Sequence, residues 1–314
     1  MFIFQQQWPA MNPIDAMQAF VRVTELASFT RAADSLGLPK ASVSIAIRQL
    51  ENQLGAQLLH RTTRRVQPTQ DGQAFYARCK ELLGDLDELQ SMFQHDKQCL
   101  RGRLRVDMPI SIANRTVIPR LADFLRDHPQ LEIELSSTDR KVDLIAEGFD
   151  CVLRVGVLDD SSLVARTLGS LRIVNCVSPA YLREHGVPRT LDDLPRHWLV
   201  HYANTLGSRP LGFEYRDGVA YRHIAMRGVI TVNNTEAYEA ACLAGLGIIQ
   251  APEAGVRPLL ESGAMVEVMP EYRAEAMPMS FLYAQRHNLP RRTQVFMAWL
   301  GALLAPSLEG LSAL

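Results

Sequence analysis

Apolar residues between positions 28 and 54 repeat at helical spacing on either side of a short break. The first apolar face carries Phe29, Ala32, Ala33 and Leu36. The second, in alternating four- and three-residue steps, carries Val43, Ile47, Leu50 and Leu54. Gly37 interrupts the pattern, and Pro39 suits the first turn of a new helix, where its missing N–H is not needed. The pattern predicts two short helices joined by a tight turn, a helix-turn-helix.

The face of the second helix opposite its apolar stripe is largely polar. At about 100° per residue it carries Ala41, Ser42, Ile45, Arg48, Gln49 and Asn52. Arg48 and Gln49 have donors that match guanine and adenine in the major groove, and Ile45 suits a thymine methyl group. This face predicts a surface that reads bases. The alternative is an ordinary helical hairpin with a solvated polar face.

A third helix is predicted ahead of these two. Apolar residues from Ile14 to Thr24 recur at helical spacing, Asn12 suits its cap and Pro13 its first turn. This helix can close a three-helix core. Residues 1–10 lack the pattern, and we expect them to be an extension or the product of an upstream start codon.

A basic segment follows the helix-turn-helix. Residues 58–69 mix β-forming residues with Arg61, Arg64 and Arg65. We interpret them as a β-wing whose arginines contact the DNA backbone or a minor groove, in preference to a solvated basic loop. The whole chain has 33 basic and 34 acidic residues, so its affinity for DNA must be local. Positions 40–65 contain five lysine or arginine residues and one acidic residue, and this local excess of positive charge suits phosphate contacts.

A long helix with a coiled-coil repeat is predicted from Asp71 onward. Its apolar positions, again in four- and three-residue steps, are Phe75, Cys79, Leu82, Leu86, Leu89 and Phe93. Pairing of two such helices would make a dimer that reads an interrupted inverted repeat. The alternative is a helix packed on its own domain.

The rest of the chain alternates between strand and helix patterns, which predicts an α/β sheet with parallel pairs. We expect strands near residues 104–108, 131–135, 151–155, 173–177, 199–202, 228–232, 248–249, 265–268 and 279–283. We expect helices near residues 117–124, 142–147, 235–244 and 291–304, with a loop at 109–114. A unit of this size favours two lobes.

Polar residues directly follow several of these strands. Open α/β sheets bind small molecules at the carboxyl ends of their strands, which is where these residues are expected to lie. The candidates for an effector site are Ser111, Asn114, Thr138, Asp139, His201, Tyr202, Asn233 and Asn234. Plain capping and turn formation is the alternative for each of them. Arg154 is a further candidate because it interrupts an apolar strand, although an internal salt bridge is favoured over a ligand contact.

Composition limits the class of protein. The five cysteines are scattered without a C-x-x-C pair, which is typical of a reducing cytoplasm, and no apolar run is long enough to span a bilayer. No nucleophile-elbow, zinc-protease or Walker A motif is present, so we expect neither catalysis nor a cofactor or metal. Cys242 as a redox sensor is less favoured than a buried thiol.

Two stretches carry a family resemblance. AMQAFVRVTELASFTRAADSLGL and VSIAIRQLENQLGAQLLHRTTRRVQPTQDG closely resemble the LysR-type transcriptional regulators. STDRKVDLIAEGFDCVLRVG resembles the effector domain of the subgroup that includes CrgA-like and AphB-like regulators. The resemblance covers the whole chain. One departure is in the recognition helix, where Pro39, Lys40 and Ile45 replace residues frequent in the family, so the base preference is expected to differ.

The resemblance implies a fold of the α/β class with three parts. These are a winged helix-turn-helix in residues 1–70, a linker and dimerisation helix with a hinge in 71–102, and a two-lobed effector domain similar to periplasmic binding proteins in 103–314. Lobe I would comprise residues 103–170 and 275–305, and lobe II residues 171–274. By position, Ser111, Thr138, His201 and Asn233 match the loops that line the family's effector cleft.

We therefore expect a cytoplasmic, DNA-binding transcriptional regulator that is not an enzyme. Its partners would be double-stranded DNA, a small-molecule effector, further copies of itself in a dimer or tetramer, and RNA polymerase, but no membrane. The expected DNA-binding residues are Ser28, Thr30, Lys40, Ser42, Ser44, Ile45, Arg48, Gln49, Arg61, Arg64 and Arg65. The alternatives are a ligand-independent DNA-binding repressor and a solute-binding or enzymatic α/β protein with an appended helical domain.

Overall fold

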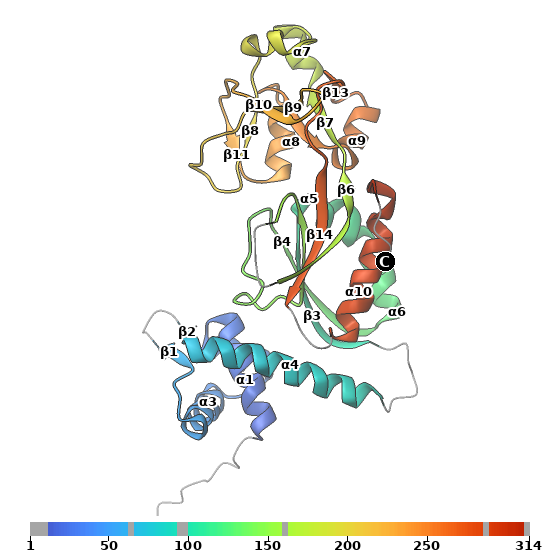
Figure 1. The fold of residues 1–314 in the computed structure, drawn as a ribbon. Helices are drawn as coiled ribbons and strands as arrows, with labels where there is room; N and C mark the ends of the chain where they lie inside the picture. Colours follow the sequence, from blue (N-terminus) through green and yellow to red (C-terminus); the bar gives the residue numbers. More distant parts are fainter. Residues whose placement is uncertain (1–11, 62–65, 93–99, 159–162, 285–288, 311–314) are drawn as a thin grey trace, which may run out of the picture. The chain divides into compact units, whose positions relative to one another are not determined.

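The computed structural model describes residues 12–61, 66–92, 100–158, 163–284 and 289–310 (Figure 1). Internal contacts divide the chain into two units. The first holds the residues up to position 97 together with short segments at 145–148 and 286–290, and the second holds the rest. Each unit has a buried core of its own.

The first unit contains three short helices, a two-stranded wing and a long helix. Its elements are α1 (Pro13–Leu26), α2 (Phe29–Leu36), α3 (Lys40–Leu54), β1 (Leu59–Arg61), β2 (Val66–Pro68) and α4 (Gln70–Met92). The strands β1 and β2 pair antiparallel, as the wing prediction requires. The Asn12 side chain accepts a hydrogen bond from the Ile14 N–H, which confirms the predicted cap of α1.

Small residues let the helices of this unit approach closely. Ala32 and Ala33 on α2 are fully buried with Phe20 of α1 and Ile47 of α3. Gly37 ends α2 with a φ of 64°, a left-handed conformation that glycine adopts without strain. The predicted helix-turn-helix is therefore confirmed, with the turn where the sequence places it.

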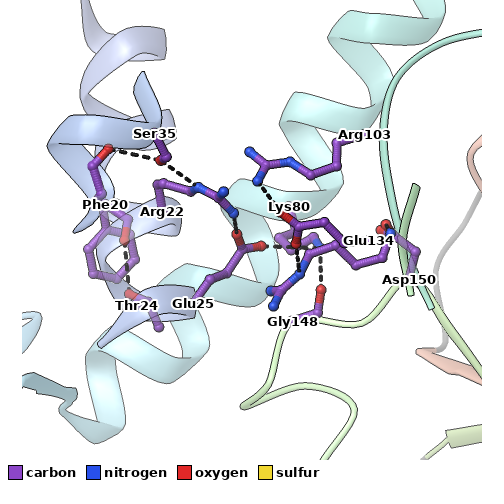
Figure 2. A network of polar contacts seen from close by, with 12 residues as sticks. Phe20, Arg22, Thr24, Glu25, Ser35, Lys80, Arg103, Glu134, Gly148 and Asp150 are labelled. Atoms are coloured by element: carbon purple, nitrogen blue, oxygen red, sulfur yellow. Dashed lines mark hydrogen bonds and ion pairs between the residues drawn. The ribbon is translucent and has the colours of Figure 1, made fainter. Parts of the chain in front are cut away.

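A buried polar network ties α1 to α2 and α4 (Figure 2). Arg22 donates to the Ser35 hydroxyl at 2.8 Å and to the Glu25 carboxylate at 3.1 Å. Lys80 of α4 approaches the same carboxylate at 3.6 Å, and the Tyr76 hydroxyl donates to it at 3.4 Å. Because the Arg22 and Glu25 side chains are both nearly buried, their attraction offsets part of the free-energy cost of removing two charges from water.

The face of α4 that carries the coiled-coil repeat is divided between two environments. Cys79 is buried in the core of its own unit, and Phe75 packs against Phe20 with ring centroids 5.5 Å apart. Leu82 is 49% exposed and Leu86 is half-buried. The prediction that Cys79 lies on a dimerisation seam is wrong, because the three-helix core already covers it. The side chains of Leu89 and Phe93 lie outside the described residues.

The second unit begins with lobe I, which is built on a five-stranded sheet of order β4-β3-β5-β14-β6. Its strands are β3 (Arg101–Met108), β4 (Gln130–Ser137), β5 (Cys151–Val155), β6 (Leu163–Leu171) and β14 (Met277–Ala284). Its helical segments are α5 (Ile110–Ile112), η1 (Ala113–Val117), α6 (Ile118–Asp127) and α10 (Arg291–Leu304), with the short turn η3 (Ala305–Ser307). Strand β3 runs parallel to β4 and β5, which confirms the predicted parallel pairs.

Lobe II holds the elements between β6 and β14. They are β7 (Ile173–Val177), α7 (Pro179–His185), η2 (Leu191–Arg196), β8 (His201–Tyr202), β9 (Phe213–Arg216), β10 (Tyr221–Ile224), β11 (Thr231–Val232), α8 (Thr235–Leu243), β12 (Ile249–Pro252), α9 (Glu253–Glu261) and β13 (Val266–Glu267). β12, β7 and β13 form one sheet, and β8 pairs parallel with β11. In Figure 1, β6 and β14 extend between the two lobes.

Two predicted segments of lobe I differ from the structure. Residues 110–114 of the segment expected to be a loop at 109–114 are helical. Pro109 is the N-cap of α5, which continues without a break through η1 into α6. The segment expected to be a helix at residues 142–147 forms only turns. Its backbone hydrogen bonds are those of turns, from the Gly148 N–H to the Ile145 carbonyl at 3.2 Å and from the Phe149 N–H to the Leu144 carbonyl at 2.9 Å. Leu144 is buried there. No described helix is long and apolar enough to cross a membrane.

We predict that Gly72→Ala destabilises the first unit. A Cβ at Gly72 would lie 1.9 Å from the carbonyl oxygen of Leu58, at the start of the wing. Since neither backbone can move without disturbing the wing, we expect a loss of about 1–3 kcal/mol or more in the free energy of unfolding. Gln73→Ala, an exposed change on the same helix, is the matched control. Equal thermal unfolding of the two variants would contradict the close contact.

Candidate functional site

The polar face of α3 is open to solvent. Ile45 is 49% exposed, and Lys40, Arg48 and Gln49 are exposed as well. Ser42 and Ser44 are half-buried, while Val43, Ala46, Ile47 and Leu50 on the opposite side are buried. The helix therefore presents the arginine, amide, hydroxyl and apolar groups that suit base edges in a major groove.

Two further expected DNA contacts lie at α2. Ser28 caps this helix by accepting a hydrogen bond from the Arg31 N–H at 3.3 Å, and Thr30 in its first turn is exposed. The capping contact occupies one acceptor position of Ser28 and leaves its hydroxyl hydrogen for another partner.

The wing is held to α3 and α4 by side-chain contacts. The Glu51 carboxylate accepts hydrogen bonds from the N–H groups of Leu58 and Leu59 at 3.0 and 3.2 Å. Thr69 donates to the Gln57 carbonyl at 2.6 Å and accepts from the Gly72 N–H at 2.9 Å. The single acid in the basic segment is therefore a structural anchor. Arg64, Arg65 and the side chain of Arg61 lie outside the described residues.

The expected effector residues are distributed over elements of both lobes. Ser111 lies in α5 and Asn114 in η1, Thr138 and Asp139 follow β4, and Arg154 lies in β5. His201 and Tyr202 form β8, and Asn233 and Asn234 join β11 to α8. We call this region, where α5, η1 and residues 138–140 meet β8 and the start of α8, the lobe junction.

Asp139 is the residue that joins the two lobes most directly. One carboxylate oxygen accepts a hydrogen bond from the Ile110 N–H of lobe I at 3.1 Å, and the other accepts from the Thr235 N–H of lobe II at 2.6 Å. Burial raises the pKa of Tyr202, and the nearby Asp139 charge raises it further. Tyr202 also packs edge-on against Tyr238 of α8. Tyr202 therefore packs on the apolar core of lobe II, and its phenol lies near enough to Asp139 of lobe I for that charge to act on it.

Arg154 forms the internal salt bridge that the sequence favours. It contacts the fully buried Asp107 at 2.5 Å, and its own side chain is only 13% exposed. It also donates to the Arg140 carbonyl at 3.2 Å, while the Thr138 hydroxyl donates to Asp107 at 3.3 Å. Arg154 is thus committed to holding the loop that carries Asp139.

Other candidates have simpler structural roles. Asn234 caps α8 by accepting from the Ala237 N–H at 2.8 Å, so for this residue the capping alternative applies. The His201 ring lies against Gly228, where a Cβ would come within 2.4 Å of it, and burial lowers the pKa of this histidine. Asn233 is exposed and Ser111 is half-buried.

Cys242 is fully buried, and burial raises the pKa of its thiol, so the group lacks the exposed thiolate of a redox sensor. Within the described ranges, no cluster of histidine, cysteine and carboxylate side chains could hold a metal ion.

The sequence analysis missed a second set of contacts across the lobe junction. Arg115 forms a two-pronged ion pair with Glu239 at 3.0 and 2.6 Å and also donates to the Gly255 carbonyl at 2.7 Å. Asn114 donates to Glu236 at 2.7 Å. The π-helical turn η1 carries both Asn114 and Arg115. The only sequence signal was Glu239 within an apolar stretch, because its partner is 124 residues away.

Comparisons with known proteins agree with this arrangement. Residues 14–73 match the bacterial regulatory helix-turn-helix protein model of the lysR family, and residues 97–305 match the LysR substrate binding domain. The chain belongs to the LysR family of transcriptional regulators.

Relatives of this LysR-family chain include an uncharacterized HTH-type transcriptional regulator of Escherichia coli, YhjC. The two are 48% identical over 95% of this chain and 100% of the relative. An HTH-type transcriptional repressor of Pseudomonas aeruginosa is 35% identical over 95% of this chain and 94% of its own length. The solved structure of CrgA, a LysR-type regulator from Neisseria meningitidis, is similar with a TM-score of 0.58 and 28% identity, covering 92% of this chain and 98% of CrgA. The expected family, fold class and non-enzymatic role are thereby confirmed.

We predict that Arg115→Ala destabilises the effector half of this LysR-family chain. Glu239 is 8% exposed and would lose the strongest partner that balances its charge. We expect a cost of about 1–3 kcal/mol, limited because Arg115 itself is 40% exposed. Arg126→Ala removes an arginine from a solvent-exposed pair with Asp123 and should change little in urea unfolding. If both variants unfold like the parent, the Arg115–Glu239 pair does not support the junction.

Proposed function

We propose that this regulator binds an interrupted inverted repeat in double-stranded DNA as a homo-oligomer and responds to a small-molecule effector held at the lobe junction. The observation that carries the DNA-binding half is the open face of α3, where Arg48, Gln49 and Ile45 are exposed side by side above a buried apolar stripe. Ser42 and Ser44 flank them on the same helix. Lys40, with Arg61, Arg64 and Arg65 of the wing, would contact phosphates.

The lobe junction supports the effector half of the proposal. Its support is that Asp139 of lobe I accepts a hydrogen bond from the Thr235 N–H of lobe II and that Asn114 donates to Glu236 across the same junction. Ser111, Thr138, His201, Tyr202 and Asn233 are the further residues that we propose to contact the effector. A ligand that contacts both lobes favours the arrangement of the lobes in which it makes more contacts, and so changes the population of that arrangement. The experiment is a thermal-shift screen of small organic acids, amines and neutral aromatics, with any hit tested for its effect on the operator footprint. A footprint that no ligand alters would favour the ligand-independent repressor.

The exposed part of α4 supports the oligomeric half. Leu82 is 49% exposed although it continues an apolar repeat, and Leu86 follows it one helical turn later. Pairing of two such faces would remove Leu82 from water and set the spacing of two α3 helices on DNA. The proposed function also includes assembly of two such dimers into a tetramer and contact of the regulator with RNA polymerase.

Arg48→Ala tests the base-reading role. Removing a side chain that donates to base edges should weaken binding to the specific operator by about 1–3 kcal/mol while leaving weak nonspecific binding in place. The measurement is a binding titration on operator and on scrambled DNA at one salt concentration. Arg126→Ala, which removes the same charge far from α3 in sequence, is the control and should bind as the parent does. Loss of affinity equal on both DNAs would assign Arg48 to phosphate contact instead.

Leu82→Asp tests the oligomer. Because Leu82 is exposed within the chain, the change should leave the fold intact, whereas a carboxylate buried between two α4 helices would be strongly unfavourable. We expect sedimentation velocity to show loss of the dimer. Gln73→Asp places the same charge on an exposed position of the same helix and should leave the dimer intact. A Leu82→Asp variant that sediments as the parent does would place the interface elsewhere.

A further inference from the structure

The Asp139 carboxylate is hydrogen-bonded to main-chain N–H groups from both lobes. Ile110, at 3.1 Å, follows strand β3 of lobe I, and Thr235, at 2.6 Å, is the first residue of α8 in lobe II. The two donors engage different oxygens of the same carboxylate. Hydrogen bonds to an ionised carboxylate are stronger than those between neutral groups, so this one side chain forms a direct link between the lobes.

The loop around Asp139 is fixed on both sides. Before it, the Thr138 N–H donates to the Met108 carbonyl at 3.0 Å and the Thr138 hydroxyl donates to Asp107 at 3.3 Å. After it, the Arg140 carbonyl accepts from Arg154 at 3.2 Å. Because Asp107 and Arg154 are a buried ion pair of the lobe I sheet, the carboxylate is held in place by the core.

The start of α8 is where an anion would be favoured, since free N–H groups and the positive end of the helix dipole meet there. Asp139 takes the Thr235 N–H, and Asn234 takes the Ala237 N–H. The Thr235 hydroxyl oxygen belongs to the same first residue of α8. It is buried and finds no hydrogen-bond partner among the described residues. The Asp139 carboxylate thus occupies the place at the start of α8 where an anion is favoured.

Charge at the junction works against a second anion. Arg115 is paired with Glu239 and Arg154 with Asp107, so these two cations are already neutralised. Glu236 adds a further carboxylate in the first turn of α8. A ligand carboxylate at this place would meet the Asp139 charge at short range, with the best donors already taken.

We propose that Asp139 is a specificity-determining residue that fills the anion position of the lobe junction. Small carboxylates are thereby excluded from the start of α8, and the part of an effector that meets Asp139 is neutral or cationic. This inference rests on the proposed function for the existence of an effector. The exclusion of carboxylates depends on Asp139 alone and is testable without an effector or an operator.

The test is chemical rescue of Asp139→Ala in the full chain. Removing the side chain should lower the melting temperature by a few degrees, because two N–H groups lose their acceptor and the lobes lose a link. Sodium acetate should restore at least half of that loss in the variant, relative to sodium chloride at equal ionic strength. Acetate should not shift the parent. Benzoate, like acetate, should raise the melting temperature of Asp139→Ala and leave that of the parent unchanged.

Two further variants separate this role from a general loss of stability. Asn234→Ala removes a cap from the same helix but leaves Asp139 in place, so it should be destabilised without rescue by acetate. Asp139→Asn keeps the volume and fills the position with a neutral amide, so acetate should not rescue it either. If Asp139→Ala is recovered only unfolded, the readout becomes the folded yield on refolding in acetate against chloride.

Three outcomes would overturn the inference. These are acetate stabilisation of the parent equal to that of Asp139→Ala, rescue of Asn234→Ala to the same extent, and no gain for Asp139→Ala in acetate by either readout. Rescue of Asp139→Ala combined with an operator footprint that no ligand alters would leave the role of Asp139 standing. The proposed response to an effector would then be the part that fails.

Discussion

The buried ion pair between Asp107 and Arg154 is the constraint on which the lobe junction depends. Asp107 is fully buried on β3, and Arg154 lies on the neighbouring strand β5. Either charge alone would be strongly unfavourable in that environment, so each requires the other. Together they hold Thr138 and Arg140 by hydrogen bonds, which fixes the direction of Asp139. A contact inside one lobe thus decides how that lobe meets the next.

The DNA-binding unit is organised by the same kind of constraint. The Arg22–Glu25 pair joins α1 to α2 through Ser35 and to α4 through Lys80. Small residues at the helix crossings permit this close approach, and polar contacts then fix one arrangement among those that apolar packing would allow. The exposed face of α3 is held in position by what lies beneath it.

Helices and strands that lie at a surface could be predicted from the sequence because one side of each is buried. The helices from Pro13, Phe29, Lys40 and Arg291 were identified because apolar residues recur at their period. The prediction failed where the buried residues did not recur at the spacing of a helix or a strand. This is the case at residues 109–114, expected to be a loop, and at residues 142–147, expected to be a helix. The strands β9 and β10 were missed because each has only four residues and β10 is largely exposed. Cys79 fits the heptad repeat of α4, but the repeat alone does not say whether a second chain or the core of the same unit covers that face of the helix.

The sequence by itself determined the family, the order of its parts and the side chains on the exposed polar face of α3. These follow from local spacing and from motifs that lie within a few tens of residues. Only the tertiary structure decided that Asp139 would meet Thr235, 96 residues away, and that Arg115 would meet Glu239. Such pairs leave almost no local pattern. Asp139 and Arg115 alone cannot be told from solvated charges or caps, and only the apolar neighbours of Glu239 give a signal. Their significance comes from the low dielectric and the geometry that folding creates around them.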